Sequence, residues 1–137
     1  MKKYLFLMIA LVGLVGMSGC SKDDDGYYNP NRTFVYTVTQ NEWSLNDDGS
    51  ITHDINLPEL TDYYITDGFV SVAISSDGEQ SYEIIPATVD GVAYSANYAV
   101  GSVIIRGQDP LVNPEFPINP GATVTVKIVL SDSDFVP

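Results

Sequence analysis

The stretch Trp43-Ser-Leu-Asn-Asp-Asp-Gly-Ser-Ile-Thr-His-Asp-Ile-Asn-Leu57 decides the fold class of this chain. After a polar turn signal, apolar and polar residues alternate, so that Ile51, Ile55 and Leu57 share one face. A period of two is typical of a β-strand with one buried face. Gly49 tolerates the positive φ angle that a tight hairpin turn requires. The segment therefore predicts a β-hairpin, with Trp43 and Leu45 on a common face of its first strand.

The same period of two recurs along the rest of the chain. Turn signals such as Thr66-Asp67-Gly68 and Val89-Asp90-Gly91 separate short alternating runs, as in antiparallel sheets. The segment 107–121 contains half of the prolines and is predicted to be a loop. One helical turn is predicted at 59–66. Strands are expected at 33–39, 43–45, 51–57, 69–75, 80–85, 92–100, 102–106 and 122–130.

About seven to eight short strands without a long helix predict an all-β protein. The strands at 69–75 and 122–130 are apolar on both faces near their centres. A single sheet would leave such strands uncovered on one side. The pattern therefore favours two antiparallel sheets packed as a sandwich, immunoglobulin-like or jelly-roll-like. A closed barrel is the alternative, which periodicity does not separate from a sandwich.

The chain begins with Lys2 and Lys3, followed by an apolar run from Tyr4 to Val15. This run is shorter than the roughly 18 residues that a membrane-spanning helix requires. A cationic start before a brief apolar run is typical of a removable signal peptide. The run is followed by Met17-Ser18-Gly19-Cys20, which contains the only cysteine of the chain.

Met17-Ser18-Gly19-Cys20 resembles the lipobox of bacterial lipoproteins, with Met17 where that family usually has Leu. The resemblance implies cleavage after Gly19, a diacylglycerol on the sulfur of Cys20, and a further acyl chain such as palmitate on the new amino terminus. More than one acyl chain makes membrane anchoring stable. The domain plan is then a signal peptide at 1–19, a lipidated flexible tether at 20–32 and a β-sandwich at 33–137.

The residues directly after Cys20 are Ser21, Lys22, Asp23, Asp24 and Asp25. A run of charges like this is commonly a solvated spacer. Placed next to the cysteine, it also resembles the acidic export signal of Bacteroidetes surface lipoproteins. That resemblance implies an outer-membrane location facing the cell exterior. The inner leaflet, facing the periplasm, is the alternative.

A second resemblance covers positions 33–134. Leu57-Pro58-Glu59-Leu60-Thr61, Asp67-Gly68-Phe69-Val70-Ser71-Val72 and Val124-Thr125-Val126-Lys127-Ile128 are similar to segments of small uncharacterised Bacteroidetes lipoproteins. The resemblance implies a β-sandwich domain and an unknown role.

The composition is strongly acidic, with 18 Asp and Glu residues against 6 Lys and Arg and a net charge of −12. Loss of residues 1–19 would remove Lys2 and Lys3, which takes the net charge from −12 to −14. Such a surface repels phosphate backbones and anionic headgroups. Nucleic acid is therefore excluded as a partner, and contact with the membrane is expected through the lipid on Cys20.

Candidate catalytic and metal-binding residues are few. His53 is the only histidine and shares a face with Ile51 and Ile55, which favours a structural residue at the edge of the core. No nucleophile-elbow sequence is present. One histidine and a lipidated cysteine leave only carboxylates for zinc. We expect no catalytic residue, no metal and no cofactor.

Acidic segments offer two further possibilities. The segment 46–50 faintly resembles a calcium loop, but the twelfth residue from Asn46 is Leu57 in place of the closing Glu, so a hairpin turn is favoured. A glycosidase requires two carboxyl groups at a suitable separation. Its candidates here are Glu59, Asp62, Glu83 and Glu115.

Aromatic residues are the strongest indication of binding. The chain contains nine Tyr, a residue enriched at wet interfaces. Tyr63 and Tyr64 lie in a connection, where burial is less expected, and are predicted as ligand contacts. Packing within the sandwich is predicted for Tyr36, Trp43, Tyr82, Tyr94 and Tyr98.

These patterns lead to three functional hypotheses. The first is a non-catalytic surface binding or accessory module for a glycan or a protein. The second is a structural subunit or spacer in an outer-membrane assembly. A hydrolase ranks last.

Overall fold

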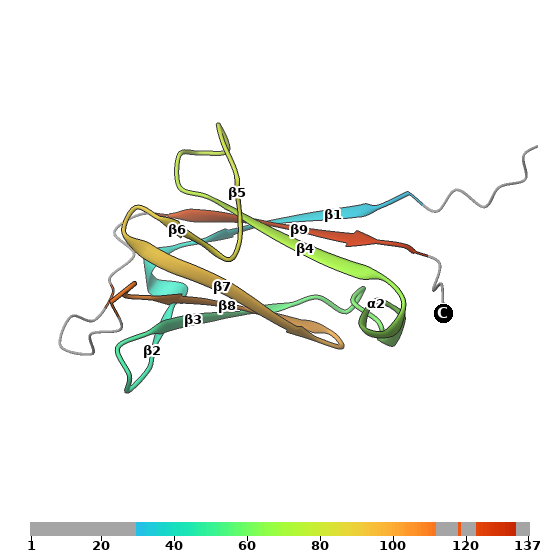
Figure 1. Cartoon of the computed structure of the whole chain (residues 1–137), viewed down its shortest axis with the longest axis horizontal. Coiled ribbons are helices and arrows are strands. Elements are labelled where there is room, and N and C mark those ends of the chain that lie inside the picture. The colour runs from blue at the N-terminus through green and yellow to red at the C-terminus, as the bar shows by residue number, and fades with distance from the viewer. Residues whose placement is uncertain (1–29, 112–117, 119–122, 134–137) are drawn as a thin grey trace, which may run out of the picture.

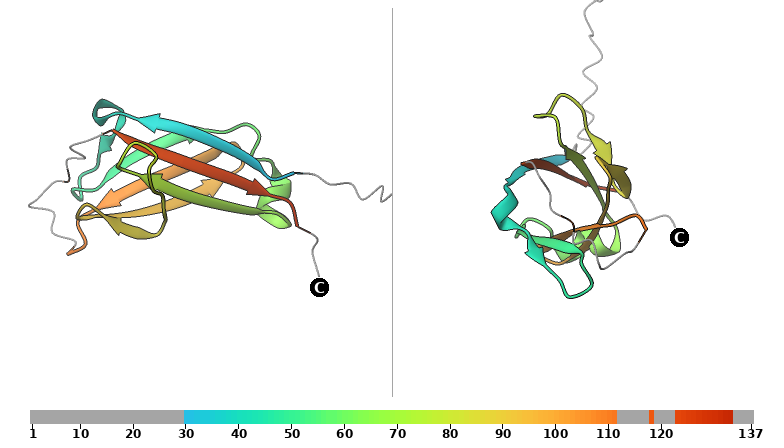
Figure 2. Two further views of the ribbon diagram at one scale, coloured as in Figure 1. Left: turned by 90° about the horizontal axis from the view of Figure 1, so that it is seen from above. Right: turned by 90° about the vertical axis from the view of Figure 1, so that its left-hand side faces the viewer.

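Two antiparallel sheets pack face to face in the computed structural model, which describes residues 30–111, 118 and 123–133 (Figure 1; Figure 2). The predicted two-layer sandwich is confirmed, and the sheets do not close into a barrel. Their strand orders are β1-β9-β4-β5 and β2-β3-β8-β7-β6. The strands are β1 (Arg32–Val38), β2 (Ser44–Leu45), β3 (Ile51–Asn56), β4 (Phe69–Ser75), β5 (Glu83–Ile84), β6 (Ala87–Val89), β7 (Val92–Ala99), β8 (Ser102–Gln108) and β9 (Val124–Ser131).

Two short helices connect the layers. The 3-10 helix η1 (Gln40–Glu42) lies between β1 and β2, and the α-helix α2 (Asp62–Thr66) lies between β3 and β4. The helical turn expected at 59–66 is thus confirmed, although it begins later. Among the described residues, no helix has the length and apolar character needed to span a membrane.

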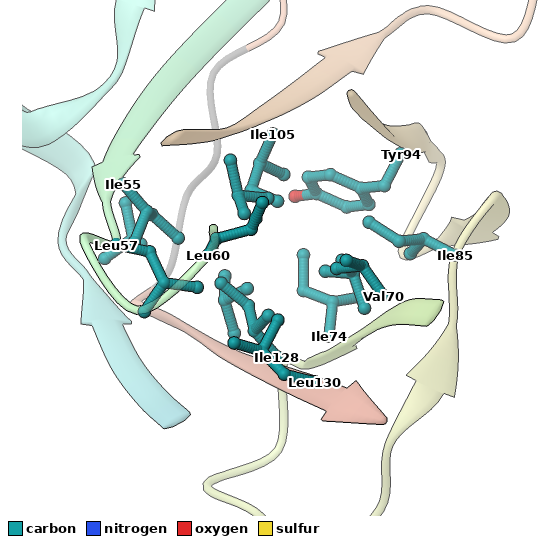
Figure 3. Close-up of a cluster of buried hydrophobic side chains, with 14 of the residues drawn as sticks. Ile55, Leu57, Leu60, Val70, Ile74, Ile85, Tyr94, Ile105, Ile128 and Leu130 are labelled. Carbon is teal, nitrogen blue, oxygen red and sulfur yellow. The ribbon is translucent and has the colours of Figure 1, made fainter. Parts of the chain in front are cut away.

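The hydrophobic core lies between the two sheets and follows the period of two. Five inward side chains of β8 and β9 are completely buried: Val103, Ile105, Val126, Ile128 and Leu130. Figure 3 shows Ile105 of one layer and Ile128 and Leu130 of the other pointing into the same core. Burial of one such side chain stabilises a fold by about 1.5–3 kcal/mol. Strand β9 is central because β1 and β4 pair with its two edges.

The predicted hairpin forms between β2 and β3. Leu45 pairs with Ile51, and the N–H of Asn46 donates to the carbonyl oxygen of Ser50 at 2.8 Å. Gly49 adopts φ = 78°, as the turn requires. The side chain of Leu45 is nevertheless exposed, unlike that of Trp43. Its pairing with the buried Ile51 places Leu45 on the inward face expected for Trp43 and Leu45, and its exposure reflects its position at the end of a two-residue strand at the sheet edge.

Strand β5 is much shorter than the strand expected at 80–85. The carboxylate of Asp77 accepts hydrogen bonds from the N–H groups of Gln80 and Ser81, at 3.1 and 3.0 Å. These bonds hold the chain in a loop, and pairing with β4 begins only at Glu83. Strand β6 has three residues and was not expected; it pairs with β7 through a tight turn at Asp90-Gly91. Of the segment predicted as a loop at 107–121, Gly107 and Gln108 belong to β8, and residues 112–117 and 119–121 lie outside the described part of the chain.

Candidate functional site: a lateral groove between the sheets

A groove opens along one side of the sandwich where the two sheets separate. It has a volume of about 130 Å³ and is lined by residues of β4, β5 and β7. We call it the lateral groove; its lining residues are Phe69, Val70, Ser71, Val72, Ile84, Ile85, Ala96 and Tyr98. Figure 1 shows β4 and β7 in opposite layers, joined at one side by the connection that runs from β5 to β6.

Strand β4 forms one wall and has an incompletely paired edge. Strand β5 covers only part of that edge, pairing with Ala73 and Ile74 and adding one bond from the N–H of Ile85 to the carbonyl oxygen of Val72. The next residue is Pro86, which has no N–H with which to continue the ladder. Within the described residues, the segment 69–71 therefore pairs only with β9.

Strand β7 forms the opposite wall and has a similar gap. Strand β6 pairs with β7 only from Val92 to Tyr94. In the described part of the chain, residues 95–99 of β7 therefore pair with β8 alone. The lateral groove lies between two strand segments that each have backbone groups available along one edge. Such edges are templates for pairing with another strand.

Most side chains that line the lateral groove are apolar, while polar atoms contribute a substantial part of its exposed surface. Val70, Val72 and Ile85 form its floor and belong to the buried core; Figure 3 shows Val70 and Ile85 beside Tyr94. Its rim carries Phe69, Ile84 and Tyr98, whose side chains are 60%, 71% and 39% exposed. Exposed apolar residues gathered at a concavity are characteristic of binding sites. No lining residue is charged.

The loop before β5 is held in place by one carboxylate. Asp77 accepts hydrogen bonds from the hydroxyls of Ser81 and Ser75 at 2.6 and 2.7 Å, besides the two backbone N–H groups. These hydrogen bonds lower the pKa of Asp77 to about 2, and the bond from the Ser81 hydroxyl has the largest effect. The loop leads directly into β5, so it fixes the position of Ile84 at the rim.

The same loop is also attached to the outer face of the β1-β9-β4-β5 sheet. The ammonium nitrogen of Lys127 lies 3.5 Å from the centre of the Tyr82 ring, a cation–π contact. The Tyr82 hydroxyl donates to the Glu79 carboxylate at 2.6 Å, and this hydrogen bond is the main reason why its pKa is raised to about 12. The prediction that Tyr82 packs within the sandwich is therefore wrong, because its ring lies outside the hydrophobic core.

The two aromatic residues predicted as ligand contacts have structural partners. Tyr64 is only 4% exposed, so the expectation that it avoids the core is wrong; its hydroxyl accepts a hydrogen bond from Arg32 at 3.0 Å. Tyr63 is more exposed, but its hydroxyl donates to the carbonyl oxygen of Ser133 at 2.9 Å and accepts from the Ser133 N–H. The ring centres of Tyr63 and Tyr64 are 5.1 Å apart. Their contact with a ligand stays a prediction.

Of the other aromatic residues predicted to pack within the sandwich, three do so and Tyr98 is partly exposed. Tyr94 is buried, and Tyr36 and Trp43 pack against the core as expected. Tyr98 has the inward parity of its strand but lies at the rim of the lateral groove. Sequence reasoning missed Phe69 as a site residue, because strand alternation places it on the outer face. It also missed Ile84, because the sequence pattern predicts a longer strand at 80–85 there.

His53 lies at the edge of the core, as its parity indicates. Its Nδ1 atom is 2.9 Å from the carbonyl oxygen of Glu42, and its ring centre is 6.0 Å from that of Trp43. These contacts account for the residue structurally. Within residues 30–111, 118 and 123–133, no group of three or more His, Cys, Asp or Glu side chains is arranged to hold a metal ion.

The carboxylates considered for a glycosidase lie on separate elements, and Asp48 of the calcium-loop candidate is bound by neighbouring side chains. Glu59 precedes α2 and Asp62 is its first residue, whereas Glu83 lies on β5, away from α2 (Figure 1). In the segment 46–50, Asp48 accepts from the backbone N–H and the hydroxyl of Ser50 and forms an ion pair with Arg106. That segment is a hairpin turn, as predicted.

Several predicted residues lie outside the described part of the chain. They are the lipidation residue Cys20, the export segment Ser21, Lys22, Asp23, Asp24 and Asp25, and the glycosidase candidate Glu115.

Comparison with known proteins adds no assignment to this geometry. No protein-family model, curated protein or solved structure matches the chain.

Proposed function

We propose that this protein is a lipid-anchored envelope lipoprotein whose β-sandwich is a non-catalytic binding module for an extended segment of a partner protein. The observation that carries the proposal is the lateral groove, an uncharged concavity lined mainly by apolar side chains, with Phe69, Ile84 and Tyr98 exposed at its rim. A surface lipoprotein with such a concavity is suited to holding a partner at the membrane.

The backbone around the lateral groove favours an extended peptide. Segments 69–71 of β4 and 95–99 of β7 each lack a second strand partner among the described residues. In β-augmentation, an added strand bonds to such an edge and places alternate side chains into pockets. One of these edges would supply the hydrogen bonds, and the apolar floor would supply the pocket.

The size of the lateral groove fits one anchoring side chain. A cavity of about 150 Å³ is known to accommodate a benzene ring, and the volume here is about 130 Å³. An aromatic or branched aliphatic side chain would bury its surface against Val70, Val72 and Ile85. Transfer of such a side chain from water into the groove would contribute about 1.5–3 kcal/mol to the free energy of binding.

A glycan is the competing ligand at a cell surface. Sugar recognition requires polar side chains for the ring hydroxyls in addition to an aromatic face, and among the lining residues only Ser71 and Tyr98 carry a hydroxyl. The apolar lining therefore favours a protein segment.

Membrane anchoring is supported by the sequence alone. The lipobox-like Met17-Ser18-Gly19-Cys20 and the acidic residues that follow support an outer-membrane lipoprotein facing the exterior. A structural subunit of an outer-membrane assembly is the second candidate, and the long edge strand β1, which among the described residues pairs only with β9, favours it.

The test uses the full chain purified in detergent, with a phage-displayed library of random nine-residue peptides as the probe. We expect the selected peptides to carry apolar residues at alternate positions. Ile84→Asp and Phe69→Ser should weaken their binding by about 30-fold or more, as expected for residues of an interface centre. Leu45→Asp is the matched control, because Leu45 is equally exposed but lies on β2. It should bind like the wild type.

Two results would overturn the proposal. One is a failure to select peptides, or the selection of peptides that bind the groove variants as tightly as the wild type. The other is binding to a glycan array that Phe69→Ser abolishes, which would assign the lateral groove to sugars. Circular dichroism of each variant would establish that the sandwich is intact.

A further inference from the structure

Strand β1 is the only long strand at a sheet edge in the described part of the chain. The other edge strands, β2, β5 and β6, have two, two and three residues, whereas β1 has seven. It pairs only with β9 there, so one row of its N–H and C=O groups faces away from the sheet. Proteins usually protect such an edge with proline, lysine, a bulge or a short length, and Thr33–Val38 has none of these.

The sequence of β1 is self-complementary about its centre. Thr33-Phe34-Val35-Tyr36-Thr37 has threonines at both ends, aromatic residues next to them, and Val35 in the middle. In an antiparallel pair of two copies, with the twofold axis at Val35, each residue meets one of its own kind. Threonine lies opposite threonine, Phe34 opposite Tyr36, and Val35 opposite Val35. Like pairs of this type stabilise neighbouring strands.

Charge also favours contact at this strand. The protein carries 18 carboxylates, so two copies repel over most of their surfaces. Strand β1 contains no carboxylate, and its first residue is Arg32. Lys127 of the neighbouring strand β9 is paired directly with Val35. A second copy that pairs with this edge therefore meets no carboxylate of β1.

We propose that two copies of this chain associate through antiparallel pairing of their β1 strands, in the register that places Val35 opposite Val35. The four strands of each β1-β9-β4-β5 sheet then form one continuous sheet across a twofold axis. Such a twofold contact is the commonest form of homodimer. Because β4 and β5 lie at the far side of this sheet from β1, the lateral grooves of both copies stay open.

The test measures the mass of the full chain, purified from membranes in detergent, by native mass spectrometry and by light scattering after size exclusion. We expect a dimer. Val35 is 47% exposed and faces outward, so Val35→Lys should leave the single sandwich folded. In the dimer it would place two ammonium groups opposite each other and weaken association roughly tenfold or more. Ile104→Lys is the matched control, because Ile104 is an exposed apolar residue on β8; this variant should remain dimeric.

A crosslink tests the register directly. Val35→Cys in whole cells, under mild oxidation, should give a disulfide-linked dimer on a non-reducing gel. Ile104→Cys and the wild type, whose only cysteine is Cys20, should not. A wild-type chain that is monomeric throughout the accessible concentration range would overturn the proposal. So would a dimer that neither Val35 variant alters, or a complex with a different protein that Val35→Lys disrupts. None of these readouts depends on peptide binding by the lateral groove.

Discussion

The backbone N–H of Ile85 donates to the carbonyl oxygen of Val72 at 3.1 Å, and in the described part of the chain no bond between β5 and β4 lies beyond it. The following residue, Pro86, cannot donate, and the chain crosses to β6 in the other sheet. The edge of β4 before Val72 is therefore left open, and the lateral groove lies at this opening. A binding surface thus arises where a ladder ends, without any charged or catalytic side chain in its lining.

Asp77 is expected to make the stability of the protein pH-dependent. Its pKa is lowered from 3.8 to about 2 by hydrogen bonds from Ser81, Ser75 and backbone N–H groups. A lowered pKa in the folded state means that stabilisation is complete above pH 3.8. It is then lost as the pH falls towards 2. Asp77→Asn should lower the melting temperature by a few degrees at pH 7, and the difference from wild type should shrink below pH 3.

Asp47→Asn is the control for Asp77. It removes the same charge from an exposed hairpin turn and should have little effect at either pH. Equal effects of the two substitutions would mean that net charge, and not the loop hydrogen bonds, governs the response. Thermal unfolding followed by circular dichroism measures both.

Neighbouring residues of β8 should respond very differently to truncation. Ile105 is completely buried, whereas Ile104 is 39% exposed on the outer face. Ile105→Ala should reduce the free energy of unfolding by about 2–5 kcal/mol because it leaves a cavity. Ile104→Ala should change it by about 0.5 kcal/mol or less. Urea unfolding curves would measure the two values, and similar losses would contradict the assigned alternation of β8.

Gly68 is expected to tolerate no side chain at the entry to β4. A Cβ atom there would lie 2.7 Å from Cδ1 of Tyr64 and 3.0 Å from the carbonyl oxygen of Ser131. Gly68→Ala should therefore destabilise the fold by about 1–3 kcal/mol, as overpacking does. The reason is steric, so Gly68→Ala combined with Tyr64→Leu should lose less stability than the sum of the two single changes. Strict additivity in urea unfolding would argue against the collision.

The proposed lipid anchor can be tested at a single residue. Cys20→Ala should prevent incorporation of radiolabelled palmitate and move the protein from the membrane fraction to the soluble fraction, because this one residue would carry all of the acyl chains. Ser21→Ala is the matched control and should stay membrane-bound. Replacement of Asp23, Asp24 and Asp25 by Asn should leave lipidation intact and protect the protein from protease added to whole cells. A wild-type chain that incorporates no palmitate would refute the lipoprotein assignment.

The alternation of apolar residues by itself determined the fold class and most of the core. The pattern predicts inward faces for Ile55, Val103, Ile105 and Ile128, because a strand directs alternate side chains to opposite sides whatever its neighbours are. The turn at Gly49 was predictable for a similarly local reason: few residues accept its φ angle.

Only the tertiary structure decided where the surface is open. Tyr64 is buried because α2 folds against β4 and Arg32, and no periodicity indicates that contact. Phe69, Ile84 and Tyr98 line the same groove because β4 and β7 belong to different sheets, and the order of strands in a sheet is not encoded in any single segment. Local pattern fixes which face of a strand is apolar, whereas the partner that covers it depends on residues far away in the sequence.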